Sequence, residues 1–172
     1  MFKSKFFWVC TLAIGLFSCK PPAFDRVPQK TINEIPQVFQ GSFANSELIN
    51  ASSVDTIKVD IYPKMIVLLA NGRRDTFYLN QQFQISVFDK QYWLSQTNPY
   101  DSTVNIFLLK AEKNHFDIQF LREENLGSLP VVKEVKSTFN QSKKVYATNE
   151  KQLLQIFEAT QQDRQTLRML RR

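Results

Sequence analysis

The feature that most constrains the fold is a series of short alternating segments in the middle of the chain, separated by tight turns. Residues 57–62, 83–88 and 116–121 place apolar residues at every second position, a period typical of half-buried strands. Asn71-Gly72 separates two further apolar segments, and this dipeptide favours a two-residue hairpin because both residues tolerate positive φ. No helical spacing interrupts the series, which therefore predicts a mainly β fold, an antiparallel meander.

The pattern changes toward the C-terminus. Residues 130–138 and 144–147 still predict short strands, but the spacing beyond them is helical. Asn149 can cap a helix, and Gln152 stands where a capping box needs it. One helical stripe contains Leu153, Ile156, Thr160, Leu167 and Leu170. These features predict an antiparallel β domain over residues 37–147 and a C-terminal α-helix with a basic tail over residues 148–172.

One short motif resembles a known family of β domains. Phe39-Gln40-Gly41-Ser42-Phe43 is similar to the Gly-x-aromatic element near the start of lipocalins, with Phe43 in place of the usual Trp. A meander followed by one helix is also similar to small envelope lipoproteins of Gram-negative bacteria. The resemblance implies a lipocalin-like barrel or curled sheet that holds a small apolar ligand, with Gly41 and Phe43 as fold markers. The alternative is an interior filled by the protein's own aromatic side chains.

The N-terminus has the three parts of a bacterial export signal. Lys3 and Lys5 precede an uncharged apolar run over residues 6–17, which is too short to span a bilayer. Leu16-Phe17-Ser18-Cys19 resembles the lipobox of bacterial lipoproteins, in which the cysteine receives diacylglycerol and becomes the new N-terminus. The resemblance implies a signal peptide over residues 1–18 and a membrane partner held through the lipid on Cys19.

The residues after Cys19 predict how the domain is placed. Residues 19–36 include four prolines, which favour extended backbone and predict a semi-rigid spacer. Lys20 follows the cysteine where Asp would favour the inner membrane, so we expect an outer-membrane lipoprotein. Asp25 is the first acidic residue after Cys19 and stands alone, which favours a domain that faces the periplasm. Cys10 is removed with the signal, so neither disulfides nor clustered cysteines are expected in the mature chain.

The positive charge is concentrated at the C-terminus. The formal net charge is +6, and removal of the signal leaves 20 basic and 16 acidic residues, a net charge of +4. The last nine residues include no acidic residue and four arginines, which equal this whole net charge: Arg164, Arg168, Arg171 and Arg172. On the predicted helix they lie close together, so they are candidates for contact with anionic headgroups or an acidic partner. Solvation at a helix end is the alternative. The balanced charge elsewhere argues against a nucleic-acid partner.

The sequence offers little for catalysis. His115 is the only histidine, so no multi-histidine metal site is expected, and Glu123-Glu124 would point to opposite faces of a strand. Arg73-Arg74 at a hairpin is more readily explained by solvation than by an anion contact. The aromatic side chains of Tyr92-Trp93 and Pro99-Tyr100 lie near one strand end, where packing is a better explanation than a binding site. We therefore predict a non-enzymatic envelope protein without cofactor or metal. It would either bind a small apolar ligand or act as an accessory subunit of an envelope complex.

The lipid attachment can be tested at Cys19. We expect Cys19→Ala to prevent acylation and to leave an uncleaved or mislocalised precursor, because the Cys19 thiol is the group that would accept the lipid. Mass spectrometry of the mature N-terminus provides the measurement. An unmodified N-terminus that begins at any other residue would contradict the lipoprotein interpretation.

Overall fold

The computed structural model describes residues 22–45, 57–70, 72–99, 101–127, 129–136, 142–160 and 165–172. Cys19, Asn71, Tyr100 and Arg164 lie outside these ranges, as does the whole of the predicted signal peptide. The predictions that rest on them therefore stay predictions.

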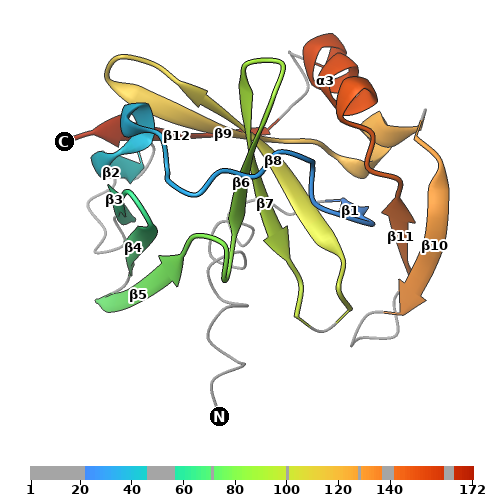
Figure 1. The fold of residues 1–172 in the computed structure, drawn as a ribbon, viewed down its shortest axis with the longest axis horizontal. Helices are drawn as coiled ribbons and strands as arrows, with labels where there is room; N and C mark the ends of the chain where they lie inside the picture. Colours follow the sequence, from blue (N-terminus) through green and yellow to red (C-terminus); the bar gives the residue numbers. More distant parts are fainter. Residues whose placement is uncertain are drawn as a thin grey trace.

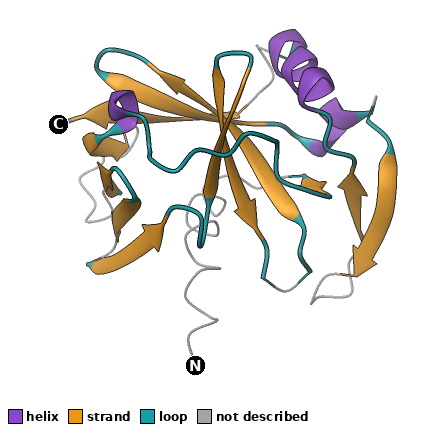
Figure 2. Ribbon diagram, in the orientation of Figure 1, coloured by secondary structure: helices purple, strands orange, loops and turns teal. Residues whose placement is uncertain are grey.

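The described residues form a 12-stranded sheet, one α-helix and two short 3-10 helices (Figures 1 and 2). The first strands are β1 (Ala23–Phe24), β2 (Gly41–Asn45), β3 (Lys58–Tyr62), β4 (Met65–Ala70), β5 (Arg73–Tyr78) and β6 (Gln84–Phe88). The later strands are β7 (Gln91–Thr97), β8 (Val104–Ala111), β9 (His115–Phe120), β10 (Val131–Lys136), β11 (Ser142–Tyr146) and β12 (Gln165–Arg171). The helices are η1 (Gln37–Phe39), η2 (Glu123–Leu126) and α3 (Glu150–Ala159).

Nine of the strands form one curled sheet in the order β5-β4-β3-β2-β12-β9-β8-β7-β6, and every pairing along it is antiparallel. In Figure 1, β3, β4 and β5 lie on the left and β6 and β7 in the centre. The direct pairing between the two ends, within the described residues, is an isolated parallel bridge between Leu79 and Phe83. We call the gap between the free edge of β5 and the strands β6 and β7 the seam. The mainly β prediction is confirmed, and the sheet is open rather than closed.

The number of strands explains the seam. An antiparallel pairing reverses the strand direction, so eight successive pairings leave β5 and β6 running the same way. Parallel neighbours need a long crossover connection, but the residues between these two strands are only 79–83. An antiparallel ladder between β5 and β6 therefore cannot close the ring. A parallel ladder cannot close it either, because the connection between the two strands is too short.

The strand β8 is buried on both faces because the structure packs a second layer behind it. Phe107 and Leu109 face the inside of the curled sheet, where they line a cavity, whereas Val104, Ile106 and Leu108 belong to a separate core. That second core contains α3, whose Phe157 packs edge-on against Trp93 of β7 at 5.3 Å. Burial on both faces accounts for the nearly continuous apolar sequence of this strand.

Two tight hairpins connect neighbouring strands of the curled sheet, and the first lies at the position predicted after Ala70. Ala70 pairs with Arg73, which leaves a two-residue connection in which Gly72 has φ +70°. Asp89 and Lys90 both have positive φ between the paired residues that end β6 and begin β7. Positive φ at both residues of the second turn is the geometry that matches the right-handed twist of the strands that it connects.

The predicted helix over residues 148–172 is correct only in its first half. Asn149 caps α3 by accepting a hydrogen bond from the backbone N–H of Gln152 at 3.1 Å, but the helix ends at Ala159. β12 follows and pairs with β9 on one side and β2 on the other. The helical prediction there is wrong because long-range pairing outweighs the helix propensity of Leu, Met and Arg.

The predicted spacer is also corrected over the part that the structure describes. Ala23 and Phe24 form β1, which pairs with β8 and β11, and Phe24 is almost fully buried. Ile35 is buried as well. Proline is compatible with this path because extended segments at a sheet edge do not need every N–H. We call residues 22–36 the strap, since they are packed on the domain.

The contribution of the strap can be measured by shortening the chain. A chain that begins at residue 22 should fold without any disulfide, whereas one that begins at residue 37 loses both Phe24 and Ile35. Each large buried side chain contributes about 2–5 kcal/mol, so the shorter chain should be less stable by at least about 4 kcal/mol. Urea unfolding followed by circular dichroism measures the difference, and equal midpoints would show that the strap is dispensable.

Tyr146 should give the stability a pH dependence. Burial raises its pKa above the ordinary value of 10.0, and the hydrogen bond from its hydroxyl to Glu123 Oε1 at 3.1 Å raises it further, as does the Glu123 charge. Because the folded pKa exceeds the unfolded one, the contribution is full below about pH 10 and is lost as the pH rises through the folded pKa.

We therefore expect the free-energy difference of about 1 kcal/mol between the native chain and Tyr146→Phe to shrink as the pH rises from about 9 to about 12. The difference between the two variants removes the contribution of the other tyrosines and lysines. Urea unfolding of both chains at each pH provides the measurement, and a pH-independent difference would contradict the expectation.

Candidate ligand-binding cavity

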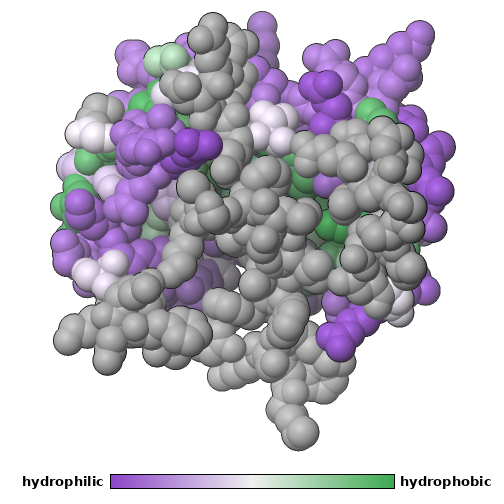
Figure 3. Space-filling model, turned by 180° about the vertical axis from the view of Figure 1, so that it is seen from behind, coloured by the Kyte–Doolittle hydropathy of each residue, from purple (hydrophilic) through white to green (hydrophobic). Residues whose placement is uncertain are grey.

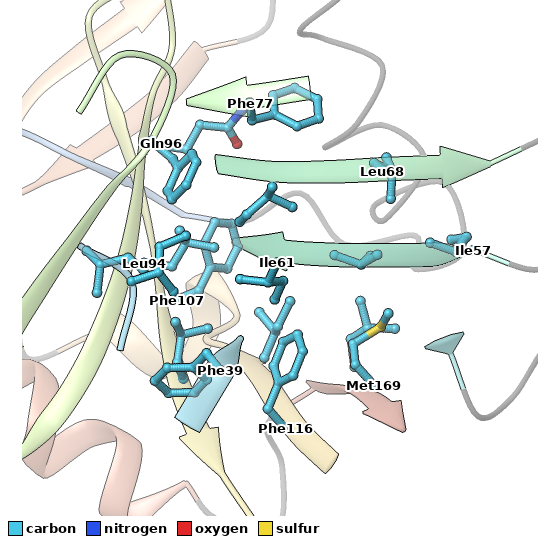
Figure 4. A pocket seen from close by; sticks show the side chains of 18 of the residues that line it. Phe39, Ile57, Ile61, Leu68, Phe77, Leu94, Gln96, Phe107, Phe116 and Met169 are labelled. Carbon is cyan, nitrogen blue, oxygen red and sulfur yellow. The ribbon is translucent and has the colours of Figure 1, made fainter. Parts of the chain in front are cut away.

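An apolar cavity of about 200 Å³ lies inside the curled sheet. Every strand of the curl except β2 contributes at least one side chain to its lining, and the strap and η1 add Ile35 and Phe39. Figure 4 shows these side chains converging from the strands on the two sides. The sequence alternation that predicts the strands also places these residues, because alternate positions face the same side of a sheet.

The chemistry of the lining is almost uniform. Among the described residues around the cavity, 18 are aliphatic, aromatic or Met side chains, and Gln96 is the one polar residue. Phe77, Phe83, Phe107, Phe116 and Phe120 supply a large aromatic share. Such a surface gains by contact with an apolar molecule and offers no group for acid, base or nucleophilic chemistry.

One end of the cavity is closed by aromatic packing, and we call it the floor. Phe39 of η1 packs edge-on against Tyr92 at 5.1 Å and against Phe116 at 6.0 Å. Phe43 of β2 packs against Phe116 at 4.7 Å. Edge-to-face pairs of this kind stabilise ring packing beyond the area that they bury, so the floor is a well-packed boundary.

Gly41 and Phe43, the two fold markers of the motif, both lie next to Arg171 at the floor. The guanidinium of Arg171 lies 4.9 Å from the ring centre of Phe43 and donates a hydrogen bond from Nη2 to the Val38 carbonyl at 3.2 Å. Gly41 has φ +130°, and a Cβ there would lie 3.0 Å from Arg171 Nη1. The positive φ favours glycine at this position, whereas the flexible end of Arg171 would need only a small shift to admit a Cβ.

The strap covers the part of the seam that runs along β6. Thr31 forms a bridge with Ser86, Ile32 donates its N–H to the Ile85 carbonyl, and Val87 donates to Lys30. Ile35 then donates its N–H to the Pro63 carbonyl at 2.7 Å, in the turn between β3 and β4. The strap thus ties β6 to the opposite half of the curl, and nothing in the sequence pattern indicated this role.

The C-terminal arginines do not form the predicted helical stripe. Arg168 lies on the outer face of β12 and makes a bidentate pair with Asp117, with Nε to Oδ1 at 2.9 Å and Nη2 to Oδ2 at 3.0 Å. Arg171 instead faces the floor, and Arg172 is bound through its backbone N–H to Ser42. Arg168 and Arg171 therefore point to opposite sides of the strand. A headgroup contact of any of these residues stays a prediction.

The other residues singled out in the sequence are mostly packed or bound. Tyr92 faces the floor and Trp93 faces the second core, so the two aromatics do not form one surface. His115 lies 3.8 Å from Asp117. Glu123 accepts from Tyr146, and Glu124 pairs with Arg122 at 3.2 Å. Arg73 and Arg74 are exposed.

Comparisons with protein-family models, with curated proteins and with solved structures found no match to this chain. Within the described ranges, no three or more His, Cys, Asp or Glu side chains are grouped so that they could hold a metal ion. Nor does the described part of the chain include a helix with the length and apolar character needed to cross a membrane.

Proposed function

We propose that this protein is a lipid-anchored envelope protein that binds a small apolar molecule inside a lipocalin-like curled sheet, without catalysing a reaction. The observation that carries the proposal is the cavity of about 200 Å³ whose walls are almost entirely apolar. A cavity of about 150 Å³ with Leu, Ile and Phe walls stays dry and binds benzene. The space in this protein suits a molecule, or part of one, of about eight non-hydrogen atoms.

The alternative is an accessory subunit of an envelope complex, which would dock through exposed apolar surface. Figure 3 shows that the described surface seen from behind is mostly hydrophilic, with hydrophobic residues in small areas. The edge strand β10 does expose Val131 and Val132 by 46% and 51%. These two residues support a partner contact. The alternative also requires a filled interior, however, and the cavity argues against one.

The lipid anchor would hold the cavity close to the membrane. Pro22, the first described residue, is buried, and residues 20 and 21 alone separate it from Cys19. A segment of this length spans about 11 Å at most. An outer-membrane anchor with a periplasm-facing domain is the arrangement that Lys20 and the lone Asp25 favour, and a small apolar ligand near a membrane surface is consistent with it.

Two neighbouring leucines provide a matched test of binding. Leu68 and Leu69 are adjacent on β4 and both half-buried, but Leu68 lines the cavity whereas Leu69 faces outward. Leu68→Trp should fill the cavity and weaken the binding of ethylbenzene by at least about tenfold, whereas Leu69→Trp should change it by less than about twofold. Isothermal titration calorimetry measures the affinity, and circular dichroism confirms that each variant folds.

If Leu68→Trp does not fold, Ile118→Phe on β9 fills the same cavity from the other wall. No binding of ethylbenzene to the unchanged protein would overturn the proposed function and favour the accessory alternative. Equal weakening by the Leu68 and Leu69 variants would show that ethylbenzene binds outside the cavity.

A further inference from the structure

The polar residues on the inner face of the curl gather beside the seam. Gln96 lies on β7 beyond the start of β6, since Gln84 already pairs with Ser95. Gln96 therefore borders the seam directly, and Figure 4 shows its amide beside the ring of Phe77 from β5. The rest of the cavity wall is apolar, so the wall has a polar side only where the sheet is open.

A second amide stands next to Gln96. Asn105 on β8 is the direct cross-strand partner of Gln96, and alternation places it on the same face as Phe107 and Leu109, which line the cavity. Direct partners on one face have Cβ atoms about 5 Å apart. The Oδ1 atom of Asn105 is buried and has no hydrogen-bond partner among the described residues.

A buried acceptor without a partner is unfavourable, and a bound group that donates a hydrogen bond to it would remove that cost. An entirely apolar ligand would leave Asn105 Oδ1 unsatisfied. A hydroxyl both donates and accepts, so it can pair with either end of an amide. The seam is thus suited to a ligand with one small polar group at the end of an apolar body.

The charges at the seam favour a neutral group over an anion. Asp75 is half-buried on the inner face of β5, where it is the cross-strand partner of the cavity residue Leu68. Its negative charge opposes a carboxylate at this position. A charged head would also have to be desolvated between Phe77 and Phe107, which is costly without a buried counter-charge.

We infer that the ligand is an uncharged amphiphile, an apolar body in the cavity with a hydroxyl at the seam that hydrogen-bonds Asn105 beside Gln96. This inference rests on the proposed function and specifies its ligand class. The seam is accordingly the side on which the polar end of the ligand remains, and the aromatic floor limits how far the apolar end extends.

The test compares ethylbenzene with 2-phenylethanol, which differ by one hydroxyl, and with 3-phenylpropanoate, which carries a carboxylate. Asn105→Leu should lower the affinity for 2-phenylethanol by about tenfold relative to the affinity for ethylbenzene, because the ligand hydroxyl loses its buried acceptor. Ser95→Ala is the matched control. It removes a buried hydroxyl without a partner among the described residues, next to Gln96 but on the opposite face of β7, and it should leave the ratio of the two affinities unchanged. If Asn105→Leu does not fold, Asn105→Ala makes the same comparison.

The outcomes separate this inference from the proposed function. Failure of both neutral compounds to bind the unchanged protein would overturn the proposed function itself. Binding of both, with the same affinity ratio in the unchanged protein and in the Asn105 variants, would overturn the amphiphile inference and leave an apolar binding site. Tighter binding of 3-phenylpropanoate than of 2-phenylethanol would overturn the neutral head group.

Discussion

The architecture depends on the odd number of strands in the curl. Nine antiparallel neighbours cannot close on themselves, because the two end strands, β5 and β6, run in the same direction. Their connection is too short for a parallel ladder, so the wall stays open along the seam. The fold then has to protect an apolar interior without completing the ring, and the strap, the aromatic floor and the cavity are arranged around that gap.

The second core is what allows the sheet to remain open and still be firmly held. Trp93 of β7 and Leu108 of β8 are buried against α3 and its neighbours, on the side away from the cavity. The central strands are therefore fixed by packing on their outer face, and the inner face need not be filled to hold them in place. The cavity on the inner face therefore reduces packing contacts only for the residues that line it.

Sequence pattern could predict the strands from residue 57 to residue 120 because most of them alternate or are apolar throughout, and turn residues separate several of them. It could not predict β12, although Leu167 and Met169 alternate with Thr166 and Arg168, since the residues are good helix formers and their partners are distant in sequence. The cavity was out of reach for a related reason: its existence depends on how the whole sheet curls. Nor did the prolines of the strap distinguish a free spacer from a packed one.

The strap would connect the proposed lipid anchor mechanically to the cavity. With Phe24 and Ile35 buried and backbone hydrogen bonds to β6 on one side and Pro63 on the other, residues 22–36 cannot swing as a flexible linker would. Detaching them would expose two large apolar side chains, at about 2–5 kcal/mol each. A lipid on Cys19 would thus hold a body whose seam keeps a fixed direction relative to Pro22. The orientation of the cavity would be set by the fold, and not by the length of a spacer.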